Sequence, residues 1–284
     1  MTATNRLRQS LRKPGKYAQA VLRWKKLSFN DVPPIFGNAK PKSGSHLLLQ
    51  VLNGLCRVAP YTYTSSLPIR SITREGRKRS QAEILADLRA LPPREIGWGY
   101  LPPTAENINF LCQEGRVNYF IYRDPRDVLV SHVFFATDMH TGHGMHAYYQ
   151  SLPDFDARLK VAIQGIHQDG LDLADAYQRS RSILDWLAES RVLCIRFEDL
   201  INDRDRSLLA LLDQIEKTGY RLPTAREKAL AILIEAIDPK KSHTFRSGKT
   251  GGWKNHFTAE HKALFKEVTG DLLIRLGYEN DMDW

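Results

Sequence analysis

Cysteine is scarce in this sequence. The three cysteines, Cys56, Cys112 and Cys194, stand far apart and never form a C-x-x-C pair. An odd and sparse count argues against both a disulfide framework and a cysteine-ligated zinc site. We therefore expect three buried thiols in a reducing compartment.

Long hydrophobic runs are also missing. No apolar stretch approaches the roughly 18 residues that a membrane-spanning helix needs, so we expect a soluble, cytoplasmic protein without a membrane span. The 284 residues, 42% of them hydrophobic, suffice for one large domain or two small ones. The formal net charge of +9 implies an anionic partner: nucleic acid, an anionic membrane face and a phosphorylated small molecule all fit it.

Acidic residues are absent from the first 30 positions, which are rich in lysine and arginine. This stretch lacks the apolar centre of a secretory signal, but it fits an organelle transit peptide or a basic membrane-surface helix. It also fits a solvated arm, or a first helix that packs on the domain through Leu22, Trp24 and Leu27. We prefer these last two interpretations, leave the choice between them open, and expect a basic extension (1–30) followed by one domain (31–284).

Short apolar runs bounded by turn residues predict buried strands at 35–39, 117–122 and 191–200. Apolar residues at helical spacing predict helices at 47–55, from Pro125 onward, and at 183–187, 208–215, 225–237 and 259–276. Strands that alternate with helices predict a single α/β domain, with a central parallel sheet and helices on both faces. Ligands of such sheets bind at the carboxyl ends of the strands.

The segment 37–45, between the first strand and its helix, has the composition of a P-loop-like phosphate loop. Lys42 precedes Gly44, and the Gly-Lys-Ser/Thr ending that holds Mg²⁺ in nucleotide hydrolases is absent. Backbone N–H groups with one mobile cation suit a transfer in which charge develops on a leaving oxygen. The alternative is an ordinary turn before a helix.

Two later segments carry further anion-binding groups. Arg123 ends the second strand, and Ser131 follows two helical turns later, so together they can grip a phosphate. The alternative is a surface cluster of ion pairs within RDPRD. The segment 245–257 is basic and rich in glycine, and there Arg246 and the N–H groups near Gly248 can complete an anion site.

Four sequence blocks follow one another between residue 41 and residue 257. In order, they are PKSGSHLL, RDPRDVLVS, RFEDL and FRSGKTGGWKNHF. They resemble motifs of the soluble small-molecule sulfotransferases, which use 3′-phosphoadenosine 5′-phosphosulfate (PAPS). The resemblance implies transfer of a sulfuryl group from PAPS to a hydroxyl or amine of a small-molecule acceptor, with release of 3′,5′-ADP and without a metal. The alternatives are a P-loop kinase-like phosphotransferase that uses ATP–Mg²⁺ and a nucleic-acid-binding protein, for which no recognition motif is present.

The resemblance also assigns residues to the donor. The 5′-phosphosulfate end falls to Lys42 and to the backbone of Ser43, Gly44, Ser45 and His46. The 3′-phosphate falls to Arg123, Ser131, Arg246, Ser247 and Gly248. Phe197 takes the place of an aromatic ring that stacks on adenine. Leu47 replaces a second stacking tryptophan of the family, and Ser247 replaces a lysine.

The family's general base is a histidine before a Leu-Pro pair, and Tyr100 takes that place in GWGYLPP. Either Tyr100 takes part in catalysis, or another residue substitutes, or the acceptor needs little help. His132, beside Ser131, is the first substitute, and His46 is the second. The expected catalytic residues are therefore Lys42, Tyr100 and His132.

His140, His143 and His146 stand at three-residue steps, as ligands of a metal on one helix face would. The glycines at 142 and 144 argue against a regular helix there, so we expect a lid or a wall of the acceptor pocket.

The family's dimer motif, K-x-x-x-T-V-x-x-x-E, is only half kept. Lys254 and Thr258 match it, whereas Ala259 and Ala263 replace the valine and the glutamate. We expect a monomer or a weak homodimer.

Overall fold

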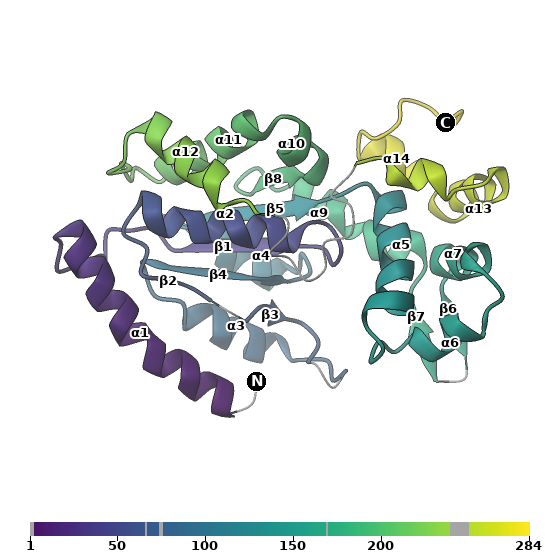
Figure 1. Ribbon diagram of the computed structural model, residues 1–284, viewed down its shortest axis with the longest axis horizontal. Coiled ribbons are helices and arrows are strands. Elements are labelled where there is room, and N and C mark those ends of the chain that lie inside the picture. The colour runs from purple at the N-terminus through teal and green to yellow at the C-terminus, as the bar shows by residue number, and fades with distance from the viewer. Residues whose placement is uncertain (1–2, 66, 74–75, 169, 239–249) are drawn as a thin grey trace. The chain divides into compact units, whose positions relative to one another are not determined.

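The computed structural model describes residues 3–65, 67–73, 76–168, 170–238 and 250–284. The chain divides into two compact units, and each unit consists of three separate segments of the sequence (Figure 1). Unit 1 comprises Met1–Lys40, Gly44–Ile121 and Glu189–Ser242. Unit 2 comprises Pro41–Ser43, Tyr122–Ala188 and His243–Trp284. The expected division at residue 30 stays a prediction.

Unit 1 is built on a six-stranded sheet with the order β2-β4-β1-β5-β8, in which β3 also pairs with β4. The strands are β1 (Ile35–Ala39), β2 (Tyr63–Thr64), β3 (Ile69–Arg70), β4 (Glu95–Tyr100), β5 (Val117–Tyr122) and β8 (Leu193–Arg196). The central strand β1 pairs in parallel with β4 and β5. Every residue of β1 and β5 is buried, which explains why both strands are mainly apolar runs in the sequence. The predicted parallel sheet is confirmed.

Strand β4 has no counterpart among the predicted strands, because it contains Gly97 and Gly99 and few β-branched residues. The second glycine is required where β3 approaches β4. A Cβ at Gly99 would lie 2.1 Å from the carbonyl oxygen of Ile69. Only a residue without a side chain fits such a close approach of two backbones.

Helices cover both faces of this sheet. In Figure 1, α2 (Ser45–Val58), α11 (Arg204–Glu216) and α12 (Arg226–Ala236) lie along one face, and α3 (Gln81–Arg89) lies on the other. The remaining helices of unit 1 are α1 (Ala3–Trp24), α4 (Ala105–Leu111) and α10 (Phe197–Asn202). The core of the unit is formed mainly by the apolar side chains of α2, α11, α12 and the strands, among them Leu48, Leu52, Leu55, Ile35, Ile121, Leu211 and Leu233.

Two predicted elements are wrong in their extent. The strand expected at 191–200 ends at Arg196, because α10 begins at Phe197 with two acidic residues in its first turn, where the helix dipole favours them. The helix expected at 259–276 is divided into α13 (Ala259–Thr269) and α14 (Leu272–Arg275). Gly270, with a φ of 55°, ends α13 in a conformation that favours glycine.

Unit 2 is mainly helical. Its other elements are α5 (Pro125–Phe134), the π-helix η1 (Phe135–Met139), α6 (His146–Ser151), α7 (Phe155–Gln164), the antiparallel pair β6 (Ile166–Gln168) and β7 (Leu171–Leu173), α8 (Ala176–Ser180), α9 (Ser182–Leu187) and the 3₁₀-helix η3 (Gly252–Asn255). Helix α5 begins as expected, with Pro125 in its first turn and Asp124 as its N-cap. Its inner face joins a core that includes Leu129, Val133, Tyr149, Leu159, Trp253 and Phe265.

Helix α1 packs on unit 1 through Tyr17, Ala20, Val21 and Trp24, which recur at helical spacing against the core. The expected contact of Trp24 is thus confirmed. The expected packing of Leu22 and Leu27 is wrong, since these side chains are 78% and 83% exposed. Within the described part of the chain, no helix has the length and apolar character needed to cross a membrane.

All three cysteines are free thiols, as expected. Only Cys112 is buried, however, and the other two are half-buried, so the expectation of three buried thiols is wrong in part. Burial raises the pKa of Cys112 to about 11 and that of Cys194 to about 12. These thiols are therefore protonated and unreactive at neutral pH.

Candidate active site

The predicted phosphate loop joins β1 to α2. Gly44 is the N-cap of α2 and has a φ of 92°, and no side chain caps the helix. A Cβ on Gly44 would lie 2.5 Å from Cδ2 of Phe197, so a side chain at this position would clash with the ring. The first N–H groups of an α-helix have no partner within the helix, and its N-terminus attracts anions. This end of α2 is suited to a phosphate or sulfate group.

Ser43, one residue earlier in the loop, is completely buried. Its hydroxyl oxygen has no hydrogen-bond partner among the residues that the structure describes. A buried hydroxyl without a partner costs about 1–3 kcal/mol. An anion bound in this loop would supply the missing partner, so the loop fits the donor group that the sequence resemblance implies.

Tyr100 ends β4 and contacts the same loop. Its hydroxyl lies 2.8 Å from Oγ of Ser45, the first residue of α2, at hydrogen-bonding distance. The guanidinium of Arg70 lies 5.3 Å from the centre of the Tyr100 ring, and the ring of Trp98 packs against it edge-on. Tyr100 is thus held on three sides, which suits a residue that positions the loop.

Lys42 lies in unit 2. Its Nζ is 3.9 Å from the centre of the ring of Phe135, a cation–π contact. Lys42 has a φ of 66°, an uncommon conformation for a residue other than glycine and one that is often found at functional sites. Phe135 opens the π-helical turn η1, and such turns also occur frequently at functional sites.

His132 on α5 is packed edge-on against two rings, with centroids 5.2 Å away at His143 and 5.9 Å away at Tyr149. Within the described residues, neither Nε2 of His132 nor the hydroxyl of Tyr149 has a hydrogen-bond partner, and both atoms are buried. Burial lowers the pKa of His132 to about 3, with smaller contributions from the charges of Arg179, His143 and Lys42. His132 is therefore a neutral imidazole at physiological pH.

Of the three histidines expected in a lid or wall, His140 and His143 follow η1, and His146 is the first residue of α6. The N–H of His143 donates to the carbonyl of His140, and the N–H of His146 donates to the carbonyl of His143, so turns rather than one regular helix connect the three residues. His146 Nδ1 lies 2.9 Å from the carbonyl oxygen of Ala136. Among the described residues there is no group of three side chains that could hold a metal, and the role as a lid stays a prediction.

The predicted phosphate ligand Arg123 is held by Asp127, a residue that sequence reasoning did not select. Nη2 of Arg123 lies 3.3 Å from Oδ2 of Asp127. The same carboxylate accepts hydrogen bonds from the N–H groups of Gly251 at 2.9 Å and Trp253 at 2.8 Å. Asp127 is 2% exposed, so the alternative of a surface ion-pair cluster is wrong. One buried carboxylate joins Arg123 to the loop at 251–253.

The other two charges of RDPRD have a structural role. Arg126 is buried and pairs with Asp124 through Nε and Nη2, and its Nη1 also pairs with Glu279. Its guanidinium lies over the rings of Trp253 and Trp284, at 3.8 and 4.5 Å from their centres. Burial raises the pKa of Asp124, an effect that Arg126 opposes. This network fixes the turn from which Arg123 extends.

The remaining predicted donor ligands are placed as follows. Phe197 is the first residue of α10 and is 6% exposed. Leu47 is in the first turn of α2, and Ser131 is on α5, both half-buried. Arg246, Ser247 and Gly248 lie outside the described residues.

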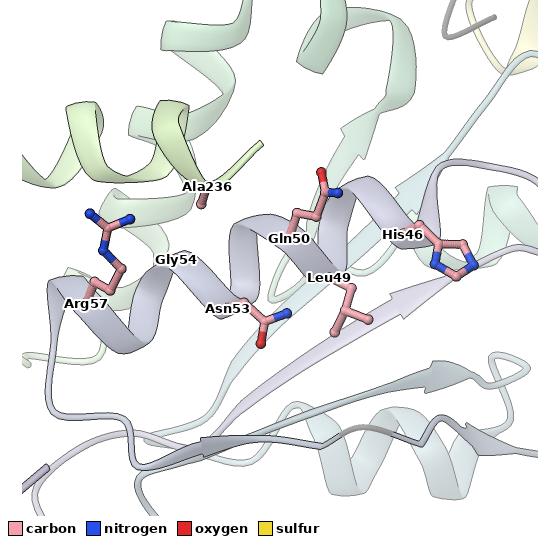
Figure 2. A pocket seen from close by; sticks show the side chains of 7 residues that line it. All are labelled: His46, Leu49, Gln50, Asn53, Gly54, Arg57 and Ala236. Atoms are coloured by element: carbon pink, nitrogen blue, oxygen red, sulfur yellow. The ribbon is translucent and has the colours of Figure 1, made fainter. Parts of the chain in front are cut away.

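A groove of about 420 Å³ runs along α2 in unit 1. Figure 2 shows its lining, which consists of His46, Leu49, Gln50, Asn53, Gly54, Arg57 and Ala236. Gln50 is fixed by two hydrogen bonds to the backbone of Asp238, and Arg57 pairs with Glu235. The groove begins at His46 in the first turn of α2, so a ligand held at this helix N-terminus can extend along it.

We expect Asp127→Ala to destabilise the protein by about 3 kcal/mol, because it removes the acceptor of the buried N–H of Trp253, of the half-buried N–H of Gly251 and of the largely buried guanidinium of Arg123. Thermal or denaturant unfolding measures the effect. Asp172→Ala is the matched control in the same unit, since its carboxylate is 87% exposed, and it should change stability by less than about 0.5 kcal/mol. Equal losses in the two variants would contradict the assignment.

Comparison with known proteins identifies the family. The sequence matches the family described as Sulfotransferase domain over residues 35–277. It is 22% identical over 243 residues to a 3-beta-hydroxysteroid sulfotransferase of Cavia porcellus, and the alignment covers 80% of this chain and 79% of that protein. It is 23% identical over 252 residues to Sulfotransferase 2A1 of Homo sapiens, which covers 82% of each protein.

The fold is similar to those of two solved structures. One is mouse sulfotransferase SULT7A1 complexed with PAP, with a TM-score of 0.59, 17% identity and coverage of 87% of each chain. The other is retinol dehydratase in complex with androsterone and inactive cofactor PAP, with a TM-score of 0.56, 15% identity and coverage of 86% of this chain and 83% of that one.

The chain therefore belongs to the sulfotransferase family. This result confirms the predicted family, the α/β fold class and the enzyme class, and it does not favour a kinase-like phosphotransferase.

Proposed function

We propose that this enzyme transfers a sulfuryl group from PAPS to a hydroxyl or amine of a small-molecule acceptor in the cytoplasm and releases 3′,5′-ADP. The observation that carries the proposal is the buried hydroxyl of Ser43, which has no hydrogen-bond partner among the described residues. It stands in a loop that leads to the N-terminus of α2, where the N-cap residue Gly44 makes no side-chain cap. The presence of PAP in two structures of similar fold supports the choice of donor.

When bound, the donor supplies the sulfuryl group together with a phosphate as leaving group. Ser43 and the first N–H groups of α2 would hold the phosphosulfate end, and Gly44 lets the loop pack closely under Phe197. Lys42 would stabilise the negative charge that develops on the leaving phosphate oxygen. Arg123 and Ser131 would bind the 3′-phosphate, together with Arg246, Ser247 and Gly248. With these charges in place we propose that no metal is needed.

We propose that His132, rather than Tyr100, accepts the proton that the acceptor group loses. The hydroxyl of Tyr100 lies within hydrogen-bonding distance of Ser45, so Tyr100 would keep the phosphate loop in place. His132 is neutral, and its buried Nε2 has no partner in the described part of the chain, so it can accept a proton. A base with so low a pKa is weak, but in a loose transition state the proton leaves late and a weak base suffices.

Thermal shift tests the donor. We expect 3′,5′-ADP to raise the melting temperature, and ATP with Mg²⁺ or duplex DNA to raise it far less, because a specific ligand stabilises the folded state according to its affinity. A larger shift with ATP–Mg²⁺ than with 3′,5′-ADP would refute the proposal. Screening of acceptor libraries with labelled PAPS would then identify the acceptor.

We expect Arg123→Ala to weaken the binding of 3′,5′-ADP by about 1.5–3 kcal/mol, the range for hydrogen bonds to a charged group. The same substitution should leave the weaker binding of 5′-AMP almost unchanged, because 5′-AMP has no 3′-phosphate. Calorimetric titration of both nucleotides measures the difference. Equal losses for the two nucleotides would show that Arg123 does not recognise the 3′-phosphate.

We propose that the enzyme is a monomer or a weak homodimer and that nucleic acid is not a partner. Thr258, in the half-kept dimer motif, is the N-cap of α13 and shares a capping box with His261. Thr258→Asp keeps a capping side chain, so it tests the interface without removing the cap. We expect sedimentation to show either a monomer or a dimer that dissociates on dilution; a concentration-independent dimer that Thr258→Asp dissociates would contradict this expectation.

A further inference from the structure

The end of α1 carries an exposed apolar surface. Of the large hydrophobic side chains that are exposed in the described part of the chain, Leu27 (83%) and Leu22 (78%) are the most exposed, and the next, Ile72, reaches 47%. Single exposed leucines are common on protein surfaces. Two of them five residues apart, each more than three-quarters exposed, are not explained by the packing of unit 1.

Leu22 is turned away from the core by the geometry of the helix, and Leu27 lies just beyond the end of α1. Successive residues of an α-helix are about 100° apart, so Leu22 faces a different direction from Val21, which packs on the core. Ala18, one turn before Leu22, is also exposed. In Figure 1, α1 lies on the outside of unit 1. On α1, Tyr17, Ala20, Val21 and Trp24 thus pack on the protein, while Ala18 and Leu22 face solvent.

Cations border the leucines. Lys16, Arg23 and Lys25 are exposed, and no ion pair with an acidic side chain is seen for any of them within the described residues. Lys26 is the exception, because it pairs with Asp31 at 2.6 Å. Helix α1 contains no acidic residue, and its earlier part adds further arginines and a lysine to the sequence.

We propose that α1 and Leu27 dock this enzyme on an anionic membrane surface. Leu22 and Leu27 would enter the boundary between headgroups and acyl chains, while Lys16, Arg23 and Lys25 contact anionic headgroups. Nucleic acid would match the cations but would leave both leucines in water, so a lipid surface fits the two features together. The binding is peripheral, and it is independent of the proposed donor and acceptor.

Cosedimentation of the full-length protein with vesicles tests the proposal. We expect binding to phosphatidylcholine vesicles that contain phosphatidylserine and little binding to phosphatidylcholine alone. Each cation near an anionic leaflet contributes about fivefold to the partition coefficient, so a variant with Lys16→Gln, Arg23→Gln and Lys25→Gln should bind on the order of 100-fold more weakly. The variant Leu22→Gln with Leu27→Gln, which keeps the charge, should bind at least about 10-fold more weakly.

The matched control is Arg206→Gln with Arg221→Gln and Lys228→Gln, which removes three exposed cations elsewhere on unit 1. It should bind within about threefold of the wild type. Thermal unfolding of each variant confirms that it is folded. The proposal is overturned if the wild type binds duplex DNA but not the anionic vesicles, if the control loses as much binding as the α1 cation variant, or if the leucine variant binds vesicles as well as the wild type.

Discussion

Lys42→Ala should lower kcat by on the order of 10²–10³ and change the KM for PAPS much less, because the lysine acts mainly on charge that develops in the transition state. In the structure its ammonium rests on the ring of Phe135, 3.9 Å from the centre of the ring. A cation–π contact at a partly exposed site is worth only about 0.5–2 kcal/mol, so the ammonium can turn toward an anionic leaving group. Steady-state kinetics with a confirmed acceptor measure both constants.

Lys42→Arg is the matched control, since it keeps the positive charge. The positive φ at this position strains lysine, alanine and arginine alike, so backbone strain does not distinguish the variants. The arginine variant should retain more activity than the alanine variant. A rise in KM with unchanged kcat after Lys42→Ala would show that the lysine binds the donor equally in the ground state, and the proposed role would be wrong.

His132→Ala should lower kcat by about 10², the lower range for loss of a general base, whereas Tyr100→Phe should lower it far less. The two variants are compared across pH with the same acceptor. Because burial holds the pKa of His132 at about 3, the wild-type rate should not fall near pH 6.5 as it would with an ordinary histidine base. If both variants keep the wild-type kcat and pH profile, neither residue is the base.

The low pKa of His132 also predicts how stability depends on pH. The folded protein keeps His132 neutral down to pH 3, while the unfolded chain takes up the proton near pH 6.5. Between these values the unfolded state binds more protons, so the free energy of unfolding falls as the pH is lowered. We expect the wild type to lose about 1–2 kcal/mol more than His132→Gln between pH 7 and pH 5. Parallel curves for the two proteins would contradict this assignment.

The fold could be predicted from the sequence where burial leaves a local pattern. The strands β1 and β5 are buried on both faces, so each is a mainly apolar run, and Pro125 marks the start of α5. Strand β4 left no such pattern, in part because Gly99 serves a contact with Ile69 of β3, about 30 residues away along the chain. The exposure of Leu22 could not be predicted either. An apolar residue on a helix indicates an apolar contact, but the sequence does not show which surface it contacts.

The site followed the same rule. Lys42 and Arg123 could be selected because each stands in a short motif at the end of a strand. The residues joined by the hydrogen bond between Tyr100 and Ser45 are 55 positions apart in the sequence. Asp127 accepts hydrogen bonds from Gly251 and Trp253, which are more than 120 positions away. Contacts over such distances depend on how the chain folds, and no local spacing of residues indicates them.

The bond between Arg123 and Asp127 has a consequence for the entropy of binding. A free arginine side chain loses about 1.5–2 kcal/mol of rotamer freedom when a ligand immobilises it. The side chain of Arg123 is only 12% exposed and is already restrained by a carboxylate that is itself fixed by two backbone N–H groups. Much of this entropy is therefore lost when the protein folds. The guanidinium of Arg123 is already oriented before an anion binds, so binding costs less entropy.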